Sequence, residues 1–332
     1  MNIEKISWND LDAVLLETNV YEAILIPSIG ANLIRLYNKE KNVDILRTPT
    51  ADEIETFISR PQIFGLPLLF PPNRIEDGTY SYSGKKYILP ITLPAQNNYH
   101  HGILKSQSFV VSSTSITNDS VEVEASFFSN QVNEAIFADF PHQFVCRMKY
   151  LLTDDGLTQT VTFSNLGSEA MPLGIGYHTP IRVPFCANSE KSDYKLLLSA
   201  GKRWELSDRG LPTGKLLNLT AEESFLRQEG IAPTDKPIEW ALTDEEIYVD
   251  GQPYHGAVIM DLRTNLRVFY EVDDQFKHWT LWNNGADVNW VCPEPQTWAI
   301  NAPNLELPAE LTGFQALDGG KTWSGTTKFY VK

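Results

Sequence analysis

Apolar and polar residues alternate with a period of two along much of this chain. The segments 120–128 and 157–163 place an apolar or β-branched side chain at most second positions. Successive side chains of a strand point to opposite faces, so this spacing is typical of strands with one buried face. Further short runs, β-branched or aromatic and bounded by Gly, Pro, Asn or Asp, occur at 22–27, 31–37, 143–150, 255–260 and 266–271. The pattern predicts a strand in each of these segments.

Helical signals are few. Only residues 52–58 and 220–226 favour a helix, and each begins with a residue, Asp52 or Thr220, that can cap its start. A chain of many short strands must protect its sheet edges, which predicts an all-β fold in the form of a large antiparallel β-sandwich. The Pro-, Asn- and Gly-rich segments, such as 71–73 and 283–285, are short enough to be loops. We therefore expect one domain that spans residues 1–332.

Composition and net charge exclude some classes of binding partner. The 332 residues are 42% hydrophobic, enough for a large core, and the net charge is −15 without any basic run that offsets it. This balance argues against nucleic acid and anionic membrane as partners but leaves neutral sugars open. No apolar stretch approaches a membrane span, and the N-terminal residues do not resemble a signal peptide.

The spacing of the three cysteines bears on the cellular compartment of the protein. Cys146, Cys186 and Cys292 are widely spaced and form no Cys-x-x-Cys pair, which argues against a zinc or redox motif. We interpret them as small core residues of a protein in a reducing compartment and expect a cytoplasmic location.

Two titratable side chains lie in segments where a charge is costly to hold. His178 follows Gly174-Ile175-Gly176-Tyr177 and precedes Thr179-Pro180, while Glu294 lies between Pro293 and Pro295 in an apolar, Trp-rich stretch. Each side chain could have a structural role, His178 held by a backbone carbonyl and Glu294 by an ion pair. Facing each other across a cleft, they could instead donate and accept protons near neutral pH.

Two further motifs carry polar groups. Arg74 follows the proline-stiffened turn Pro71-Pro72-Asn73, and a guanidinium fixed in this way could donate to neighbouring sugar hydroxyls. His100 and His101 are adjacent, so in an extended segment they point to opposite faces and at most one enters a shared pocket. We expect His101, next to Gly102, to be the inward one. No other cluster supplies further metal ligands at the usual spacing, so we predict no metal and no cofactor.

At these residues the chain resembles the aldose 1-epimerase (galactose mutarotase) family. The resemblance rests on four elements that follow one another in order along nearly the whole chain: Asn73-Arg74-Ile75, His101-Gly102, the mid-chain His178, and Glu294-Pro295-Gln296-Thr297. It implies a β-supersandwich fold and a cofactor-independent isomerase that interconverts the α and β anomers of a free hexose. By position, His178 corresponds to the general acid and Glu294 to the general base, with Arg74 and His101 as substrate-binding residues.

One element of the family is less well matched. The family carries an aspartate that binds sugar hydroxyls, for which Asp244 and Asp261 are both candidates here. This chain also reads Gly176-Tyr177-His178-Thr179-Pro180 where the members best known for galactose activity have an Asn-His-x-Tyr-Phe element. The resemblance therefore does not identify the preferred sugar.

Other interpretations remain open at this point. A non-catalytic sugar-binding protein on the same fold needs no acid–base pair, and a sugar-phosphate 1-epimerase should present several basic residues at its cleft. A glycoside hydrolase usually needs two carboxylates, of which only one is well framed here. Trp279, Trp282, Trp290 and Trp298 could stack on a sugar, and we expect at most one to do so. The assembly is expected to be a monomer or a homodimer.

Overall fold

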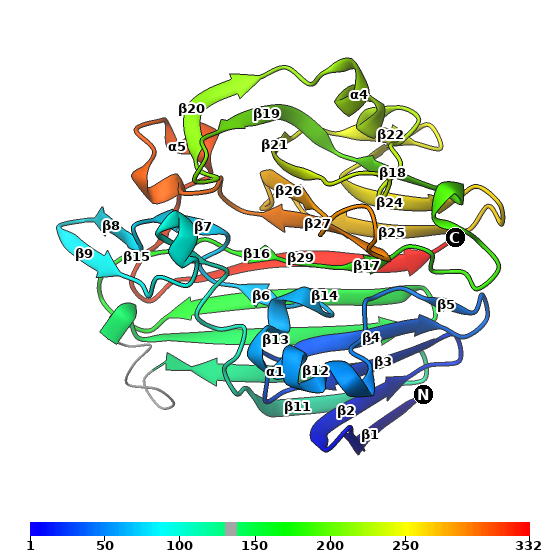
Figure 1. Cartoon of the computed structure of the whole chain (residues 1–332). Coiled ribbons are helices and arrows are strands. Elements are labelled where there is room, and N and C mark those ends of the chain that lie inside the picture. The colour runs from blue at the N-terminus through cyan, green and yellow to red at the C-terminus, as the bar shows by residue number, and fades with distance from the viewer. Residues whose placement is uncertain (130–137) are drawn as a thin grey trace.

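The computed structural model describes residues 1–129 and 138–332, and it is built almost entirely of antiparallel strands (Figure 1). Every segment predicted as a strand forms one, with ends that differ from the prediction by at most three residues. The strands belong to two sheets of eight strands, one of five and several two-stranded ribbons. The predicted all-β antiparallel architecture is confirmed.

The first large sheet has the strand order β11, β12, β13, β14, β29, β25, β24, β18. Its strands are β11 (Val110–Ile116), β12 (Ser120–Phe128), β13 (Phe144–Thr153), β14 (Gly156–Asn165), β29 (Thr322–Val331), β25 (Arg267–Val272), β24 (Gly256–Asp261) and β18 (Tyr194–Leu198). Buried and partly exposed positions alternate along β13 and β14, as the sequence pattern requires. The C-terminal strand β29, drawn in red in Figure 1, lies inside this sheet and joins its two halves.

The second large sheet has the order β20, β19, β21, β26, β27, β16, β6, and β17 also pairs with β27. Its strands are β20 (Pro212–Leu217), β19 (Ala200–Leu206), β21 (Glu239–Asp244), β26 (His278–Trp282), β27 (Trp290–Gln296), β16 (Gly176–Tyr177), β6 (Leu68–Leu69) and β17 (Ile181–Arg182). All seven residues of β27 are buried, because neighbours lie on both of its edges and both of its faces are covered.

The remaining strands form the five-stranded sheet and four ribbons. The five-stranded sheet contains β1 (Asn2–Trp8), β2 (Leu11–Glu17), β3 (Tyr21–Ile26), β4 (Asn32–Asn38) and β5 (Val43–Asp44). The ribbons pair β7 (Arg74–Glu76) with β10 (Asn98–His100), β8 (Thr79–Tyr82) with β9 (Lys85–Ile88), β15 (Met171–Pro172) with β28 (Ala316–Leu317), and β22 (Ile247–Val249) with β23 (Gln252–Tyr254).

One continuous apolar core joins the three sheets. It includes Leu25 of β3, Phe163 of β14 and Val291 of β27, all fully buried. Since each sheet presents one apolar face to this cluster, burial of those faces holds the sandwich together.

Helices are short and peripheral in the described residues. The segments 52–58 and 220–226 are helical as predicted, as the 3₁₀ turn η1 (Ala51–Glu53) with α1 (Ile54–Ser59) and as α4 (Ala221–Ser224) with η5 (Phe225–Arg227). The four-residue helix α5 (Ala309–Thr312) is too short to show a helical period in the sequence. Further 3₁₀ turns are η2 (Pro61–Ile63), η3 (Pro94–Gln96), η4 (Lys191–Asp193) and η6 (Ala302–Asn304). None of these helices has the length and apolar character needed to span a membrane.

Candidate functional site

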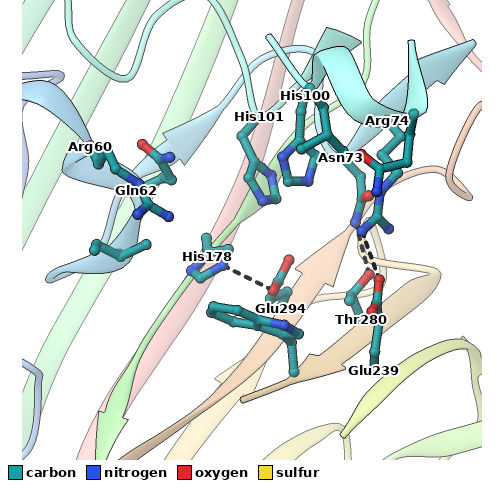
Figure 2. A pocket seen from close by; sticks show the side chains of 14 residues that line it. Arg60, Gln62, Asn73, Arg74, His100, His101, His178, Glu239, Thr280 and Glu294 are labelled. Atoms are coloured by element: carbon teal, nitrogen blue, oxygen red, sulfur yellow. Dashed lines mark hydrogen bonds and ion pairs between the residues drawn. The ribbon is translucent and has the colours of Figure 1, made fainter. Parts of the chain in front are cut away.

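A cavity of about 230 Å³ opens beside β27 and β26 (Figure 2). Residues 60–63, the β7–β10 ribbon and the second large sheet all contribute to its wall. The lining residues are Arg60, Gln62, Ile63, Asn73, Arg74, Leu93, Gln96, His100, His101, His178, Glu239, Thr280, Trp282 and Glu294. Four of the six residues that the sequence identified as candidates, His178, Glu294, Arg74 and His101, therefore lie together.

His178 reaches the cavity from the segment between two short strands. Both β16 and β17 pair with β27, and the two pairings have the same register, so residue 178 lies alongside residue 294 of β27. The chain that leads to His178 is closely packed, because a Cβ atom on Gly174 would lie 2.1 Å from the indole of Trp298. Glycine is required there by the close contact.

Glu294 enters the same cavity from the middle of β27. It is paired in register with Thr280 of β26, so both side chains lie on one face of the sheet. The Thr280 hydroxyl accepts hydrogen bonds from Asn73 Nδ2 and Gln296 Nε2, each at 3.0 Å. These bonds fix the floor of the cavity around the carboxyl group.

His178 and Glu294 are in direct contact. His178 Nε2 lies 3.3 Å from Glu294 Oε1, and both side chains are buried. On its other edge the imidazole faces Cys292, with Nδ1 3.6 Å from Sγ. Trp282 packs edge-on against the ring at a centroid distance of 5.2 Å. The histidine is thus held in one orientation with one nitrogen directed at the carboxyl group.

Burial shifts the proton affinities of this pair in opposite directions. Desolvation lowers the pKa of His178 to about 3, and the charges of Arg60 and Arg47 add to this effect. Desolvation raises the pKa of Glu294 well above its ordinary value, although Arg74 opposes the shift. Burial thus favours the neutral form of each group, a protonated carboxyl group beside a neutral imidazole.

His101 lies opposite this pair. Its backbone N–H donates to Asn73 O at 3.1 Å, its ring centroid is 5.0 Å from that of His178, and its Nδ1 is buried without a partner. The expectation that at most one of the adjacent histidines enters the pocket is wrong, because His100 also lines it. His101 has a φ of +62°, so the segment is not extended and the two rings stack at 3.4 Å instead of pointing to opposite faces.

Arg74 closes the other end of the cavity. It begins β7, and its Nη2 lies 2.7 Å from Oε1 of Glu239 on β21. Only 15% of the Arg74 side chain is exposed, and its Nε has no hydrogen-bond partner. The ion pair fixes the guanidinium while one donor stays available to a ligand.

Unpaired polar atoms gather in this cavity. Among the described residues, the lining residues with a buried side-chain atom that has no hydrogen-bond partner are Gln62 (Oε1), Asn73 (Oδ1), Arg74 (Nε), Gln96 (Oε1), His101 (Nδ1) and Glu294 (Oε2). A buried polar atom without a partner costs free energy, so such groups are normally satisfied. Their concentration around one cavity favours a polar ligand with several hydrogen-bonding groups.

The structure does not bring either candidate aspartate to this cavity. Asp244 Oδ1 accepts from Ser199 Oγ at 2.8 Å and Trp279 Nε1 at 3.2 Å, and His255 Nε2 lies 2.8 Å away. Asp261 accepts from Tyr194 and from backbone N–H groups of the turn that follows it. Both carboxylates are occupied within the protein, and neither is among the lining residues.

Several lining residues escaped the sequence reasoning. Asn73 lies in the Asn73-Arg74-Ile75 motif, but an uncharged side chain beside an arginine gives no local signal of a binding role. Glu239 and Thr280 occupy ordinary positions on strands, where nothing local distinguishes them from exposed polar residues. Of the four C-terminal tryptophans, Trp282 alone is among the lining residues.

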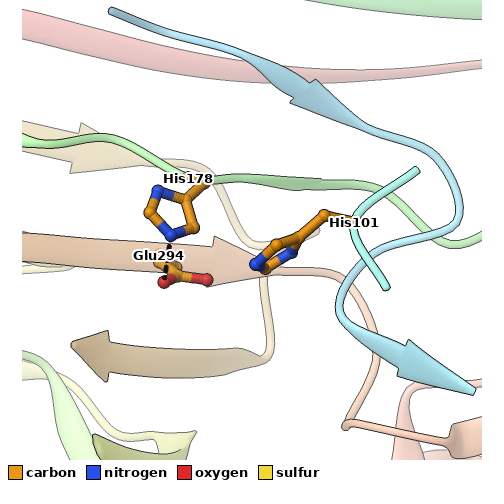
Figure 3. Close-up of side chains that lie close together, drawn as sticks. All are labelled: His101, His178 and Glu294. Carbon is orange, nitrogen blue, oxygen red and sulfur yellow. Dashed lines mark ion pairs between the residues drawn. The ribbon is translucent and has the colours of Figure 1, made fainter. Parts of the chain in front are cut away.

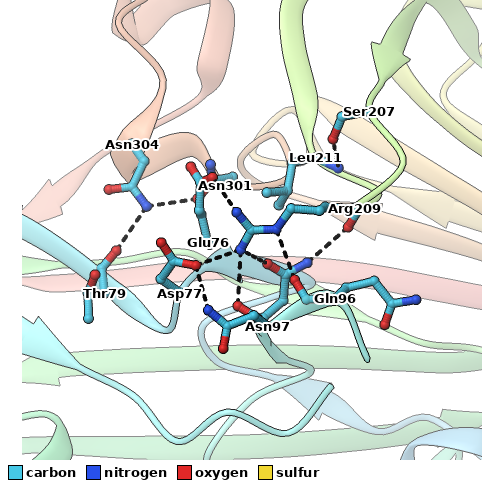
Figure 4. Close-up of polar contacts among 11 residues, drawn as sticks. Glu76, Asp77, Thr79, Gln96, Asn97, Ser207, Arg209, Leu211, Asn301 and Asn304 are labelled. Carbon is cyan, nitrogen blue, oxygen red and sulfur yellow. Dashed lines mark hydrogen bonds and ion pairs between the residues drawn. The ribbon is translucent and has the colours of Figure 1, made fainter. Parts of the chain in front are cut away.

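The ribbon that carries Arg74 and His100 is held from outside by Arg209 (Figure 4). From the turn between β19 and β20, the Arg209 guanidinium donates to Glu76 Oε1 at 2.7 Å and to Asp77 Oδ1 at 2.6 Å. It also donates to the Gln96 carbonyl at 2.9 Å. The ion pair lowers the pKa of Asp77. Arg209 thus clamps the cavity's outer wall onto the second large sheet.

Comparison with known proteins agrees with this arrangement. Residues 12–330 match the family model of aldose 1-epimerase. The chain belongs to the aldose 1-epimerase family. The crystal structure of a galactose mutarotase-like protein from Clostridium acetobutylicum superposes on this family member with a TM-score of 0.97. The two sequences are 39% identical, and the alignment covers 100% of this chain and 98% of the other.

The curated relatives of this protein have lower sequence identity to it. Bos taurus galactose mutarotase is 23% identical over 200 residues, which is 60% of this chain and 53% of that protein. The uncharacterised Escherichia coli K12 protein YihR is 27% identical over 143 residues, 43% of this chain and 42% of its own. The chain thus spans about half the length of the curated relatives it matches.

Proposed function

We propose that this protein is an aldose 1-epimerase that interconverts the α and β anomers of a free hexose. The observation that supports the proposal most is the His178–Glu294 pair, two buried titratable groups 3.3 Å apart at the wall of a cavity. Such a pair costs free energy to bury, and a strongly shifted pair in a cleft is a candidate for acid–base chemistry.

The chemistry needs one proton donor and one proton acceptor. To open a pyranose ring, the ring oxygen gains a proton while the anomeric hydroxyl loses one, and both oxygens are bonded to the same carbon. We assign His178 to the ring oxygen as general acid and Glu294 to the anomeric hydroxyl as general base. The open aldehyde then rotates and closes on its other face with the roles reversed.

The pair carries the proton that this cycle requires. Burial favours Glu294 over His178 as the site of that proton. When a sugar hydroxyl and the nearby Arg74 stabilise the carboxylate, the proton can pass to His178, and the opposite charges then attract each other at close range. Because only protons move, the proposed mechanism uses no cofactor.

The other lining residues would hold the sugar. Arg74 Nε and the Asn73, Gln62 and Gln96 side-chain oxygens are unpaired, so they can bind hydroxyl groups without breaking bonds within the protein. His101 would contact the sugar from the side opposite His178, and Trp282 offers an apolar surface beside it.

Polarimetry on freshly dissolved α-D-glucose and α-D-galactose tests the proposal. The protein should speed equilibration above the buffer rate, and His178→Asn and Glu294→Gln should each lower kcat by about 10²–10⁴-fold. Glu246→Gln, at an exposed position outside the cavity, is the matched control and should keep full activity. If the wild-type protein gave no acceleration but bound the sugars, it would be a sugar-binding protein instead.

One observation favours a second candidate, a sugar that carries an anionic group at C6. With His178 at the ring oxygen, C5 and its C6 substituent extend toward the end of the cavity where Arg60 and Gln62 lie (Figure 2). No acidic side chain in the described part of the chain forms an ion pair with Arg60, whereas Arg74 is paired with Glu239. A guanidinium without a counter-ion can bind a carboxylate or phosphate.

Two sugar series distinguish the candidates. If the substrate is anionic, kcat/KM should be higher for hexoses with a phosphate or carboxylate at C6, and Arg60→Gln should remove that advantage without changing the rate on neutral hexoses. Equal or lower values for the anionic sugars would favour the free hexose.

A further inference from the structure

Three potential metal ligands from distant parts of the sequence meet in the cavity. His101, His178 and Glu294 each offer a ligand atom, and these atoms all lie within 4.8 Å of one another (Figure 3). Across the described residues this is the one place where three or more such groups gather. We propose that the cluster binds a divalent transition metal of the Zn²⁺ class, and that the bound metal excludes the sugar.

The geometry is close to that of a tetrahedral site. Zinc bonds of 2.0–2.1 Å place neighbouring ligand atoms of a tetrahedron about 3.3 Å apart. His178 Nε2 and Glu294 Oε1 already have this separation, at 3.3 Å. The His101 ring must close a gap of at most about 1.5 Å. Since His101 sits in a turn and its Nδ1 has no partner, that movement breaks no hydrogen bond of this atom.

The ligand set also suits zinc chemically. Two imidazoles and one carboxylate are a common three-ligand set for catalytic zinc, with a fourth position open to solvent. Here the cavity provides that opening, and Glu294 Oε2 is buried without a partner. The site therefore offers three inward-facing donors and room for a water molecule.

Charges around the cluster neither exclude a cation nor attract one strongly. Glu294 and Glu239 are acidic, and Arg74 and Arg47 are paired with Glu239 and Glu53. Arg60 and Lys105 are further positive groups that act on the histidines. Affinity must therefore come from coordination itself, which favours metals that bind imidazole well over Mg²⁺ or Ca²⁺.

Occupation would stop proton transfer. A metal bound by His178 Nε2 and Glu294 occupies the atoms at which the proposed mechanism exchanges protons with the ring oxygen and the anomeric hydroxyl. This consequence for activity rests on the proposed function, whereas metal binding itself does not. Zn²⁺ should then act as a competitive inhibitor of sugar binding.

Titration of the chelator-treated full-length protein tests the proposal. Zn²⁺ binding is measured by calorimetry, and Co²⁺ binding by the visible absorption of the four-coordinate ion. We expect one ion per chain, and His101→Ala and Glu294→Gln should each weaken binding by at least about tenfold. His255→Gln is the matched control, because it removes a histidine that contacts Asp244 outside the cavity.

The outcomes separate the two proposals. Unchanged binding in His101→Ala, loss of binding in His255→Gln, or no binding by the wild-type protein would each overturn the metal site. Sugar that competes with the metal should raise the apparent Kd for Zn²⁺. An unchanged apparent Kd at saturating sugar would also contradict the inference. Metal binding by a protein without mutarotase activity would leave this inference intact and remove the proposed function.

Discussion

At the scale of single residues, the site depends on two titratable side chains whose burial costs free energy. His178 and Glu294 are buried where water cannot stabilise their charges, and each therefore favours its neutral form. The proposed mechanism moves a proton from Glu294 to His178 when a sugar binds, so the charged pair forms only where a ligand helps to stabilise it.

The pH dependence of activity follows from these shifts. Lowering the pH adds a second proton to the pair and removes its base, and because the pKa of His178 is near 3, this should happen well below pH 6.5. Raising the pH removes the proton from Glu294, and because its pKa is raised, that loss should begin well above pH 4.5. We expect kcat/KM, corrected for the buffer rate, to be flat through pH 6.5.

Measurement between pH 4 and pH 9, with thermal melts at each pH to confirm folding, checks this prediction. A fall in kcat/KM as the pH is lowered, centred near pH 6.5, would mean that His178 titrates as an ordinary exposed histidine, contrary to its position in the structure.

At the scale of elements, the cavity joins pieces of different stability. Glu294 and Thr280 stand on β27 and β26, central strands paired on both edges. Arg74 and His100 stand on β7 and β10, a two-stranded ribbon that has little stability alone. The Arg209 clamp compensates by attaching this ribbon to the turn between β19 and β20.

Arg209→Ala should therefore disturb the wall proposed to bind the substrate more than the proposed acid–base pair. We expect KM to rise several-fold with a smaller change in kcat, and stability to fall by about 1–2 kcal/mol because several partly buried hydrogen bonds are lost. Steady-state kinetics and urea unfolding measure the two effects.

Arg227→Ala is the matched control. It removes a surface arginine that pairs with Glu245 away from the cavity, so KM should not change. Arg209→Lys should restore only part of the effect, since an ammonium group cannot reproduce the forked contacts. Equal KM values in Arg209→Ala and the wild-type protein would show that the ribbon is positioned without the clamp.

At the scale of the whole molecule, the last strand completes the sandwich. β29 pairs with β14 on one side and β25 on the other, and its Phe329 is fully buried in the common core. The two halves of the first large sheet come from segments that are otherwise not hydrogen-bonded to each other. Cooperative folding should therefore require β29.

Removal of residues 322–332 tests this dependence. We expect a chain without a cooperative thermal transition by circular dichroism, because the first large sheet is divided and its apolar face is exposed. Removal of residues 1–8 takes away β1, an edge strand with no fully buried residue, and should only lower the melting temperature. A cooperative transition after loss of β29 would contradict the prediction.

The sequence alone determined the elements and the chemical character of the site. Alternation of side chains is a local property, so strands such as β12 and β14 could be predicted close to their observed ends. His178 and Glu294 stood out because charged groups are rare in apolar, Gly- or Pro-rich segments. These signals exist before any long-range contact forms.

Only the tertiary structure decided which of these groups meet. Sheet pairing brings Glu294 beside Thr280 and places the segment that carries His178 next to β27. The left-handed backbone conformation of His101 lets both His100 and His101 line one cavity. Sheet pairing also places Glu239 at the site, the α1–η2 connection brings Arg60 there, and Asp244 and Asp261 lie outside it. Proximity between residues far apart in sequence depends on strand order and register, which many contacts fix jointly and which no local pattern records.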